Sequence, residues 1–226
     1  MTKPSSVARN LIISALPAGD ARTLSASLKP VELSRNAVLY EPGERVQSVY
    51  FPEDSIISFL GDTGEGGRIE VWSVGSEGLS GVCPVVNDIS PYRGVVQVSG
   101  YALVADAAAV RRQFDRRGEF HDILLGYCQR LLVQIAQIGL CNASHEVDQR
   151  FCRWILMMQD RTGSRTLPFT QDFIAGVLGT RRATISVAAA ALQNAGLISY
   201  TPGSITIQSR RGLTAASCTC YKRLSF

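Results

Sequence analysis

Apolar positions change their spacing along the chain, and each spacing predicts a different kind of structure. Between residues 6 and 28 they recur at helical intervals, interrupted by the turn signal Pro17-Ala18-Gly19-Asp20. Between residues 31 and 105, short runs rich in β-branched and aromatic residues alternate with turns that contain Gly or Pro. Strands at this spacing predict a β-sandwich or jelly roll.

A long helix is predicted from about Asp115 to Leu140. Within it, apolar residues recur at alternating intervals of four and three, which is typical of a coiled-coil seam. Glutamine and arginine flank the seam, which favours a dimer over the alternative of one amphipathic helix packed on its own domain. The expected dimer contacts are Leu124, Cys128, Leu131, Ile135 and Ile138.

Two short helices joined by a glycine are predicted after Leu167. Thr170 is a natural N-cap for the first helix, which Gly179 ends. Thr180 is expected to cap the second, which Gly196 ends. The runs LISY and ITI, on either side of TPGS, then predict a β-hairpin. This order of elements is that of a winged helix-turn-helix.

The second of these helices suits insertion into a DNA groove. If Ile185 and Leu192 face inward, helical geometry places small side chains on the opposite side, among them Ala183, Ser186 and Val187. Small side chains let a helix lie deep in the major groove, where its N-terminal residues contact bases. The alternative is an Ala-rich helix buried in a bundle, with its arginines on the surface.

Charge is distributed unevenly along the chain, whose net charge is +4. Residues 1–143 contain thirteen Lys/Arg and fifteen Asp/Glu, whereas residues 144–226 contain ten and four. The basic excess coincides with the predicted helix-turn-helix, where a polyanion would bind. The alternative is that these basic residues form a solvated surface that binds nothing. Arg182 is placed to donate to guanine O6 and N7. Arg181, Thr180 and Thr170 are placed to contact phosphates.

The predicted fold class is α+β, in three parts. A β-roll spans residues 1–113, a dimerisation helix residues 114–143 and the winged helix-turn-helix residues 144–226. Ser144 is the expected N-cap of the first helix in the last part, which the run Arg161-Thr162-Gly163 ends.

The chain resembles the cyclic-AMP receptor protein / fumarate-nitrate-reduction regulator (Crp/Fnr) family of bacterial transcription regulators along nearly its whole length. The strings GTRRATIS and LQNAGLIS carry the most specific similarity, and VLYEPGE, VYFPEDSIIS, VGSEGLSG and VVQVSG resemble the family's cyclic-nucleotide-binding-like β-roll. The resemblance implies a homodimeric, cytoplasmic transcription regulator that binds double-stranded DNA, has RNA polymerase as a further partner and lacks catalytic activity. The alternative is a ligand-binding module that controls a partner protein through a degenerate helix-turn-helix.

The resemblance also assigns roles within the second helix. Arg182 matches a base-reading arginine of the family, and Thr184 matches a threonine of its recognition helix. Ala183 and Val187 stand where many members have a glutamate and a second arginine. We therefore expect methyl contacts to thymine at these two positions.

The β-roll departs from the family pattern for cyclic AMP. Gly81-Val82 replaces the Gly-Glu pair that holds the ribose, and Gly94 follows Arg93 where a serine or threonine is expected. A buried phosphate needs several charge-assisted donors, so we expect no ordinary cyclic AMP binding. Either another effector binds in the roll or none does. The candidate effector contacts are Gly78, Leu79, Ser80, Gly81, Arg93 and Gly94.

Neither a metal site nor a catalytic site is predicted. The six cysteines form no CxxC pair, which is typical of reduced, core-like thiols. Cys218 and Cys220 form a CxC motif that could bind a metal or sense oxidants, but this alternative is not favoured because no His or third Cys lies nearby in sequence. No cysteine precedes Cys83, unlike in relatives with an N-terminal iron–sulfur cluster, and His121 and His145 are expected on helix surfaces rather than at a haem. No apolar run reaches membrane-spanning length, and no catalytic motif is present.

Overall fold

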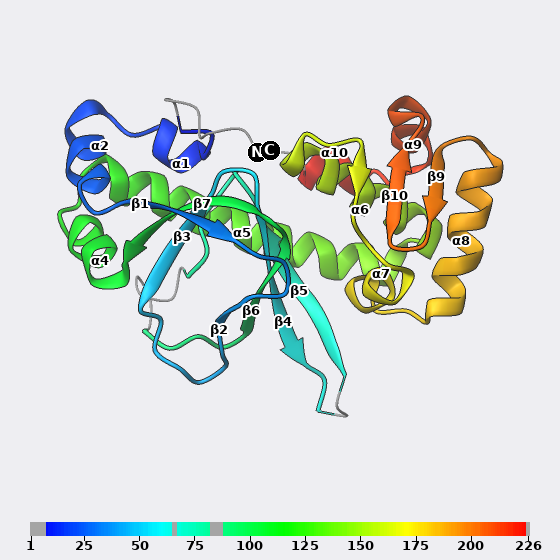
Figure 1. The fold of residues 1–226 in the computed structure, drawn as a ribbon, viewed down its shortest axis with the longest axis horizontal. Coiled ribbons are helices and arrows are strands. Elements are labelled where there is room, and N and C mark those ends of the chain that lie inside the picture. Colours follow the sequence, from blue (N-terminus) through cyan, green and yellow to red (C-terminus); the bar gives the residue numbers. More distant parts are fainter. Residues whose placement is uncertain (1–7, 65–66, 82–87, 225–226) are drawn as a thin grey trace. The chain divides into compact units, whose positions relative to one another are not determined.

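A computed structural model of the protein describes residues 8–64, 67–81 and 88–224, and the chain divides into two compact units (Figure 1). The first unit comprises Met1–Gly61 and Trp72–Leu132, and the second comprises Asp62–Val71 and Val133–Phe226. The division falls inside the longest helix, α5 (Glu119–Ser144), which contributes to both units.

Two antiparallel sheets form the roll, as the strand pattern predicted, and most of their residues belong to the first unit. The smaller sheet has the order β1 (Lys29–Leu33), β7 (Gly100–Asp106), β3 (Ser48–Pro52). The larger has the order β2 (Val38–Tyr40), β6 (Arg93–Val98), β4 (Ile56–Asp62), β5 (Arg68–Val74). Burial alternates along β3, where Val49 and Phe51 are both 0% exposed, because successive side chains in a strand point to opposite faces.

Within the described residues, three short helices accompany this roll. Helix α1 (Leu11–Ser14) begins at Asn10, whose side chain accepts hydrogen bonds from the amides of Ile12 and Ile13. The expected break at residues 17–20 is the start of α2 (Ala18–Ser25), since proline is compatible with the beginning of a helix. Helix α4 (Ala107–Asp115) was not predicted as a separate element, and α2 and α4 pack on one another (Figure 1).

An aromatic stack fills part of the roll. Phe59 stacks on Trp72 with ring centroids 4.3 Å apart and on Tyr40 at 5.9 Å, and Tyr92 meets the edge of Trp72 at 5.1 Å. Large aromatic side chains dominate the energetics of such a core. The stack therefore packs together side chains from or next to β2, β4, β5 and β6, the four strands of the larger sheet.

Helix α5 is apolar on two sides. One row of its residues is buried within the chain: Phe120, Leu124, Tyr127, Gln134 and Cys141. The other side is open, with Leu125 47%, Leu132 69%, Val133 57% and Leu140 61% exposed.

The expected dimer seam stays a prediction, and its residues lie on one stripe at the edge of the covered side of α5. Leu124 belongs to the core of its own unit at 0% exposure, and Leu131 and Ile138 follow it on the same helical row. Cys128 and Ile135 lie at the border of the open side, and both are partly buried. A repeat of four and three residues fixes the spacing along a helix, but it does not identify which of two apolar faces the chain itself covers.

Among the described residues, α5 is also the one helix whose length and composition would permit a membrane span. Its mean hydropathy is 1.3 over the most apolar window, of which 17% is buried. This is weak evidence, because Gln129, Arg130 and Gln134 interrupt the middle of the helix, where a span would bury polar groups in hydrocarbon.

The second unit is built around α6 (Val147–Thr162). This helix packs against α7 (Gln171–Leu178), α8 (Arg182–Asn194), α9 (Arg210–Ala216) and α10 (Cys220–Leu224). Helix α6 begins after Glu146 rather than Ser144, because α5 continues to Ser144, and it ends at Gly163 as expected. A three-stranded sheet has the order β8 (Thr166–Leu167), β10 (Ser204–Ile207), β9 (Ile198–Thr201), of which β8 was not predicted. The helices α9 (Arg210–Ala216) and α10 (Cys220–Leu224) complete the unit and were also not predicted.

A close approach joins α5 to the roll and gives a first test. The Tyr127 hydroxyl donates to the carbonyl oxygen of Leu79 at 3.0 Å, and a Cβ at Gly78 would overlap the Tyr127 ring. We expect Gly78→Ala to lower the free energy of unfolding by about 1–3 kcal/mol, as overpacking does in a well-packed core. Gly19→Ala is the control, because a Cβ there meets nothing within 4 Å. Urea denaturation measures both, and equal stabilities for the two variants would contradict this packing.

Candidate nucleic-acid interface

Helix α7 (Gln171–Leu178) is held by specific caps at both ends. The Thr170 hydroxyl accepts a hydrogen bond from the amide of Phe173 at 3.2 Å, as an N-cap does. Gly179 ends the helix with φ 59° and ψ 44°, the left-handed conformation that favours glycine. Both predicted boundaries of this helix are confirmed.

Helix α8 (Arg182–Asn194) begins one residue later than expected. Its N-cap is Arg181 in extended conformation, not Thr180, and no side chain caps it. The connection between α7 and α8 is therefore Gly179-Thr180-Arg181. The amides of the first turn of α8 lack a side-chain acceptor, and amides in this position suit an anionic oxygen of a ligand.

The C-terminal end of α8 is fixed by a glycine turn that leads into the hairpin. Gly196 has φ 69°, its amide donates to the Gln193 carbonyl, and the Leu197 amide donates to the Leu192 carbonyl, both at 2.9 Å. These two bonds form a Schellman motif. The Gln193 side chain accepts from the Tyr200 amide at 2.7 Å, so β9 is tied directly to α8.

The inner face of α8 carries the packing. Its buried residues are Ile185, Ala188, Ala189 and Leu192, and α8 packs against α6 and α7. Phe169 lies 4.8 Å from Trp154 and 5.1 Å from Phe173, measured between ring centroids, so the start of α7 is held against α6. The expected inward direction of Ile185 and Leu192 is confirmed.

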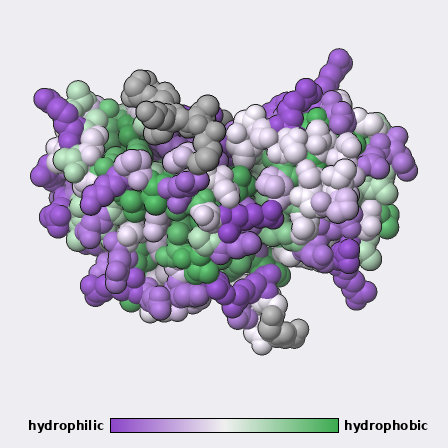
Figure 2. All heavy atoms as spheres, viewed as in Figure 1, coloured by the Kyte–Doolittle hydropathy of each residue, from purple (hydrophilic) through white to green (hydrophobic). Residues whose placement is uncertain are grey.

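The outer face of α8 is open and made of small residues. Arg181, Arg182, Ala183, Thr184, Ser186 and Val187 are all exposed, and Val187 reaches 72%. In Figure 2, α8 at the right edge shows intermediate and apolar hydropathy on part of its surface, not a continuous hydrophilic cover. Of the two other expected contacts, Thr170 is exposed and Thr180 is partly buried.

Arg182 is oriented by a neighbour on α7. Its Nε lies 3.4 Å from an oxygen of Asp172, with both side chains about 70% exposed. Such an exposed pair contributes little to stability. The pair does place the Arg182 guanidinium beside the start of α8. From there its two terminal nitrogens can donate hydrogen bonds to a bound molecule.

Part of the basic excess of this unit is internal. Arg150, Arg153 and Arg161 are only 8%, 3% and 6% exposed. Arg150 donates to the carbonyl of Leu178 at 3.1 Å and to the side-chain oxygen of Asn142 at 3.0 Å, which is a structural role. The charge that can attract a polyanion is therefore smaller than the sequence count suggested.

The candidate effector residues already have partners within the first unit. Gly78, Leu79, Ser80 and Gly81 are buried, and the Ser80 hydroxyl lies 2.8 Å from that of Tyr40. A Cβ on Gly94 would overlap the Tyr40 ring, so no open space lies over that glycine.

The other candidate effector contact, Arg93, is also engaged. Its terminal nitrogen lies 3.2 Å from a carboxylate oxygen of Glu41. Val82, where we noted the missing ribose carboxylate, lies outside the described residues. A cavity of about 350 Å³ lies elsewhere in the unit and is lined by Arg45, Asp88, Asp106 and Arg111 among others.

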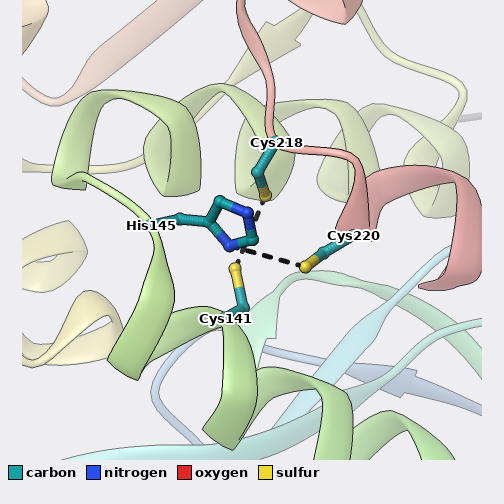
Figure 3. A group of neighbouring side chains, drawn as sticks. All are labelled: Cys141, His145, Cys218 and Cys220. Atoms are coloured by element: carbon teal, nitrogen blue, oxygen red, sulfur yellow. Dashed lines mark hydrogen bonds between the residues drawn. The ribbon is translucent and has the colours of Figure 1, made fainter.

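One group of residues was missed by the sequence search. Cys141, His145, Cys218 and Cys220 converge in the second unit, with their ligand atoms all within 4.8 Å of one another (Figure 3). We predicted no metal because no further ligand was near the CxC motif in sequence. The structure brings Cys141 and His145 to that motif from more than 70 positions away.

Comparison with known proteins identifies the C-terminal part most clearly. Residues 149–216 match the model of the Crp-like helix-turn-helix domain. No curated protein matches the chain.

Several solved structures share the fold at low sequence identity. A transcriptional regulator of the CRP family from Thermus thermophilus, TTHB099, is 16% identical with a TM-score of 0.70, over 84% of this chain and 96% of that one. FixK2 from Bradyrhizobium japonicum is 12% identical with a TM-score of 0.70, over 85% and 98%. The c-di-GMP-responsive regulator CLP from Xanthomonas campestris is 12% identical with a TM-score of 0.69, over 85% and 100%. These likenesses establish the same two-part fold for this chain.

The cap at Thr170 can be tested apart from any ligand. Thr170→Ala removes the acceptor for the Phe173 amide, so we expect a loss of about 1 kcal/mol in the free energy of unfolding. Thr184→Ala, an exposed position inside α8, should change stability by less than about 0.5 kcal/mol. Chemical denaturation of the two variants compares them. A neutral Thr170→Ala would mean that its hydroxyl does not hold the start of α7.

Proposed function

We propose that this DNA-binding transcription regulator of the Crp/Fnr family acts as a cytoplasmic homodimer that reads double-stranded DNA through α8. The observation that carries this proposal is the outer face of α8 in a domain that matches the Crp-like helix-turn-helix. Small exposed side chains permit close approach to base edges, and two arginines stand at the N-terminal end of the helix. The proposed activity includes no catalytic step.

Within this interface we assign different roles to the two arginines. Arg182 is steered by Asp172 and begins the helix, so we assign it to guanine O6 and N7. Arg181 precedes the helix beside the uncapped amides, so we assign it to a phosphate. Ala183 and Val187 offer apolar contact to thymine methyl groups.

The open side of α5 supports a two-fold dimer. Leu125, Leu132 and Gly139 are spaced by seven residues, and Ala136 lies between the last two on the same side. Exposed apolar rows of this kind mark interaction surfaces, and two-fold dimers are the commonest closed assembly. We propose this row as the seam, beside the predicted row that includes Leu124.

For regulation, we propose that cyclic AMP is not the effector. The Ser80 hydroxyl already contacts Tyr40, and Arg93 already pairs with Glu41, so a phosphate would have to displace internal partners. A role in transcription makes RNA polymerase a second macromolecular partner, which we propose on the basis of the function alone.

The arginine assignments predict two distinct defects. Arg182→Ala should weaken the free energy of binding to the cognate site by about 1–3 kcal/mol. It should also relax discrimination at one guanine in each half-site. Arg181→Ala should weaken cognate and scrambled DNA equally and lower the salt slope by about one unit for each lost contact. The two half-sites should lie about one helical turn apart. Binding constants measured over a salt series on cognate and scrambled duplexes give the loss of affinity, the sequence preference and the salt slope of each variant.

Arg211→Ala is the matched control, because it removes an exposed arginine of the same unit that lies outside α8. It should leave sequence preference unchanged. If Arg182→Ala loses affinity without any change in preference, Arg182 is a phosphate contact only. Absence of binding to all genomic fragments would instead favour a protein partner for this domain.

The proposed dimer seam predicts that one charge introduced at Leu132 prevents dimer formation. Leu132→Asp replaces a leucine that is 69% exposed in the single chain, so the chain should still fold. In the dimer the aspartate would be buried without a partner, which is costly. We expect a monomer by light scattering and a loss of affinity for palindromic DNA. Val187→Asp, at a residue 72% exposed on α8, is the control that should stay dimeric. A dimeric Leu132→Asp would place the interface elsewhere.

A further inference from the structure

Four side chains of the second unit surround a space that a single metal ion would fill (Figure 3). The Cys141 and Cys218 sulfurs are 3.5 Å apart, and Cys220 Sγ lies 3.7 Å from His145 Nδ1. Tetrahedral zinc with bonds of about 2.3 Å to sulfur and 2.0 Å to nitrogen places its ligand atoms roughly 3.5–3.8 Å apart. We propose that these residues form a Cys₃His zinc site.

The backbone presents the ligands in two pairs. Cys141 in the last turn of α5 and His145 just after it are four residues apart, and the His145 amide still donates to the Cys141 carbonyl at 3.1 Å. That spacing puts both side chains on one face. Cys218 and Cys220 flank the turn that starts α10, where the Tyr221 amide donates to the Cys218 carbonyl at 3.1 Å.

The donor atoms select the kind of metal. Three thiolates and an imidazole suit zinc, whereas magnesium and calcium prefer oxygen ligands. An iron–sulfur cluster would place several iron and sulfide atoms between the ligands and so needs a wider cage than one of 4.8 Å. A disulfide between Cys141 and Cys218 would need a sulfur separation of about 2.0 Å, shorter than the 3.5 Å found.

Polar neighbours distinguish this cluster from ordinary buried thiols. The side-chain amide of Gln137 donates to Cys220 Sγ at 3.1 Å, which is the kind of hydrogen bond that supports a metal-bound thiolate. All three cysteines are buried, and His145 is partly buried. Cys152 is also buried in this unit but is not one of the four, so it supplies an internal comparison.

Arg153 supplies the charge that the loaded site needs. Zinc with three thiolates and a neutral imidazole carries one net negative charge. Arg153 is 3% exposed, its Nε has no hydrogen-bond partner among the described residues, and one of its terminal nitrogens donates to the Met157 sulfur at 3.4 Å. Burial raises the pKa of the Cys141 thiol, and the positive charge of Arg153 acts against this rise. A buried guanidinium is costly without a negative partner.

The site would have a structural role. All four positions are taken by protein ligands, which leaves none for a substrate or water. Cys141 and Cys218 are 77 positions apart, so the ion would close a loop that contains α6, the helix-turn-helix and the hairpin. An ion that closes a long loop, and that binds only the folded state, stabilises the fold on both counts.

Metal content tests the proposal independently of DNA binding. Untagged protein, purified with a reductant, should contain about one zinc per chain by mass spectrometry. Cys220→Ser should lose nearly all of it, whereas Cys152→Ser should keep it. Full zinc occupancy in Cys220→Ser would overturn the assignment.

A second measurement uses the wild-type chain, so it does not depend on how a variant folds. Chelator-treated protein, titrated with Co²⁺ without oxygen, should develop the intense visible bands of tetrahedral thiolate coordination, and Zn²⁺ should displace them. Zinc should also raise the melting temperature of the metal-free protein. A reduced protein that takes up neither ion, a Cys141–Cys218 disulfide in place of zinc, or an iron–sulfur chromophore after anaerobic reconstitution would each overturn the proposal.

Discussion

Helix α5 has apolar residues on two sides, and the chain itself covers only one. The covered row holds the helix in place, through Leu124 in the core of the roll and through the bond from Tyr127 to Leu79. The open row would expose a large apolar surface to water unless a second chain covered it. The same helix ends at Ser144, just past Cys141, and leads directly into α6, so its position bears on both units. The roll and the helix-turn-helix unit therefore share one structural element, which also carries the proposed dimer seam.

Elements defined by local chemistry were predictable from the sequence. The cap at Thr170, the left-handed glycines at 179 and 196 and the hairpin each depend on a few adjacent residues, so the sequence alone was enough to locate the helix-turn-helix. The start of α8 was one residue off because Arg181 adopts the extended N-cap conformation without a side-chain bond, and no sequence signal marks that choice.

Features that depend on distant residues were not predictable in the same way. Cys141 and Cys218 meet across 77 positions, in a unit where α9 and α10 pack against α6. The side of α5 that faces inward depends on the roll and not on the helical repeat. Gly78 and Gly94 looked like contacts for a ligand, but the rings of Tyr127 and Tyr40 occupy the space over them. In each case the missing information was a neighbour far away in sequence.

One face of α8 packs within the chain, and the opposite face is exposed. Ile185, Ala188, Ala189 and Leu192 are buried and hold the helix, whereas Ala183, Ser186, Val187 and Ala190 are exposed. Substitutions at exposed positions usually change stability very little. If α8 reads DNA as proposed, its base preference can therefore change without a compensating change in the core. A laboratory library at those four positions would then vary specificity on a fold that remains intact.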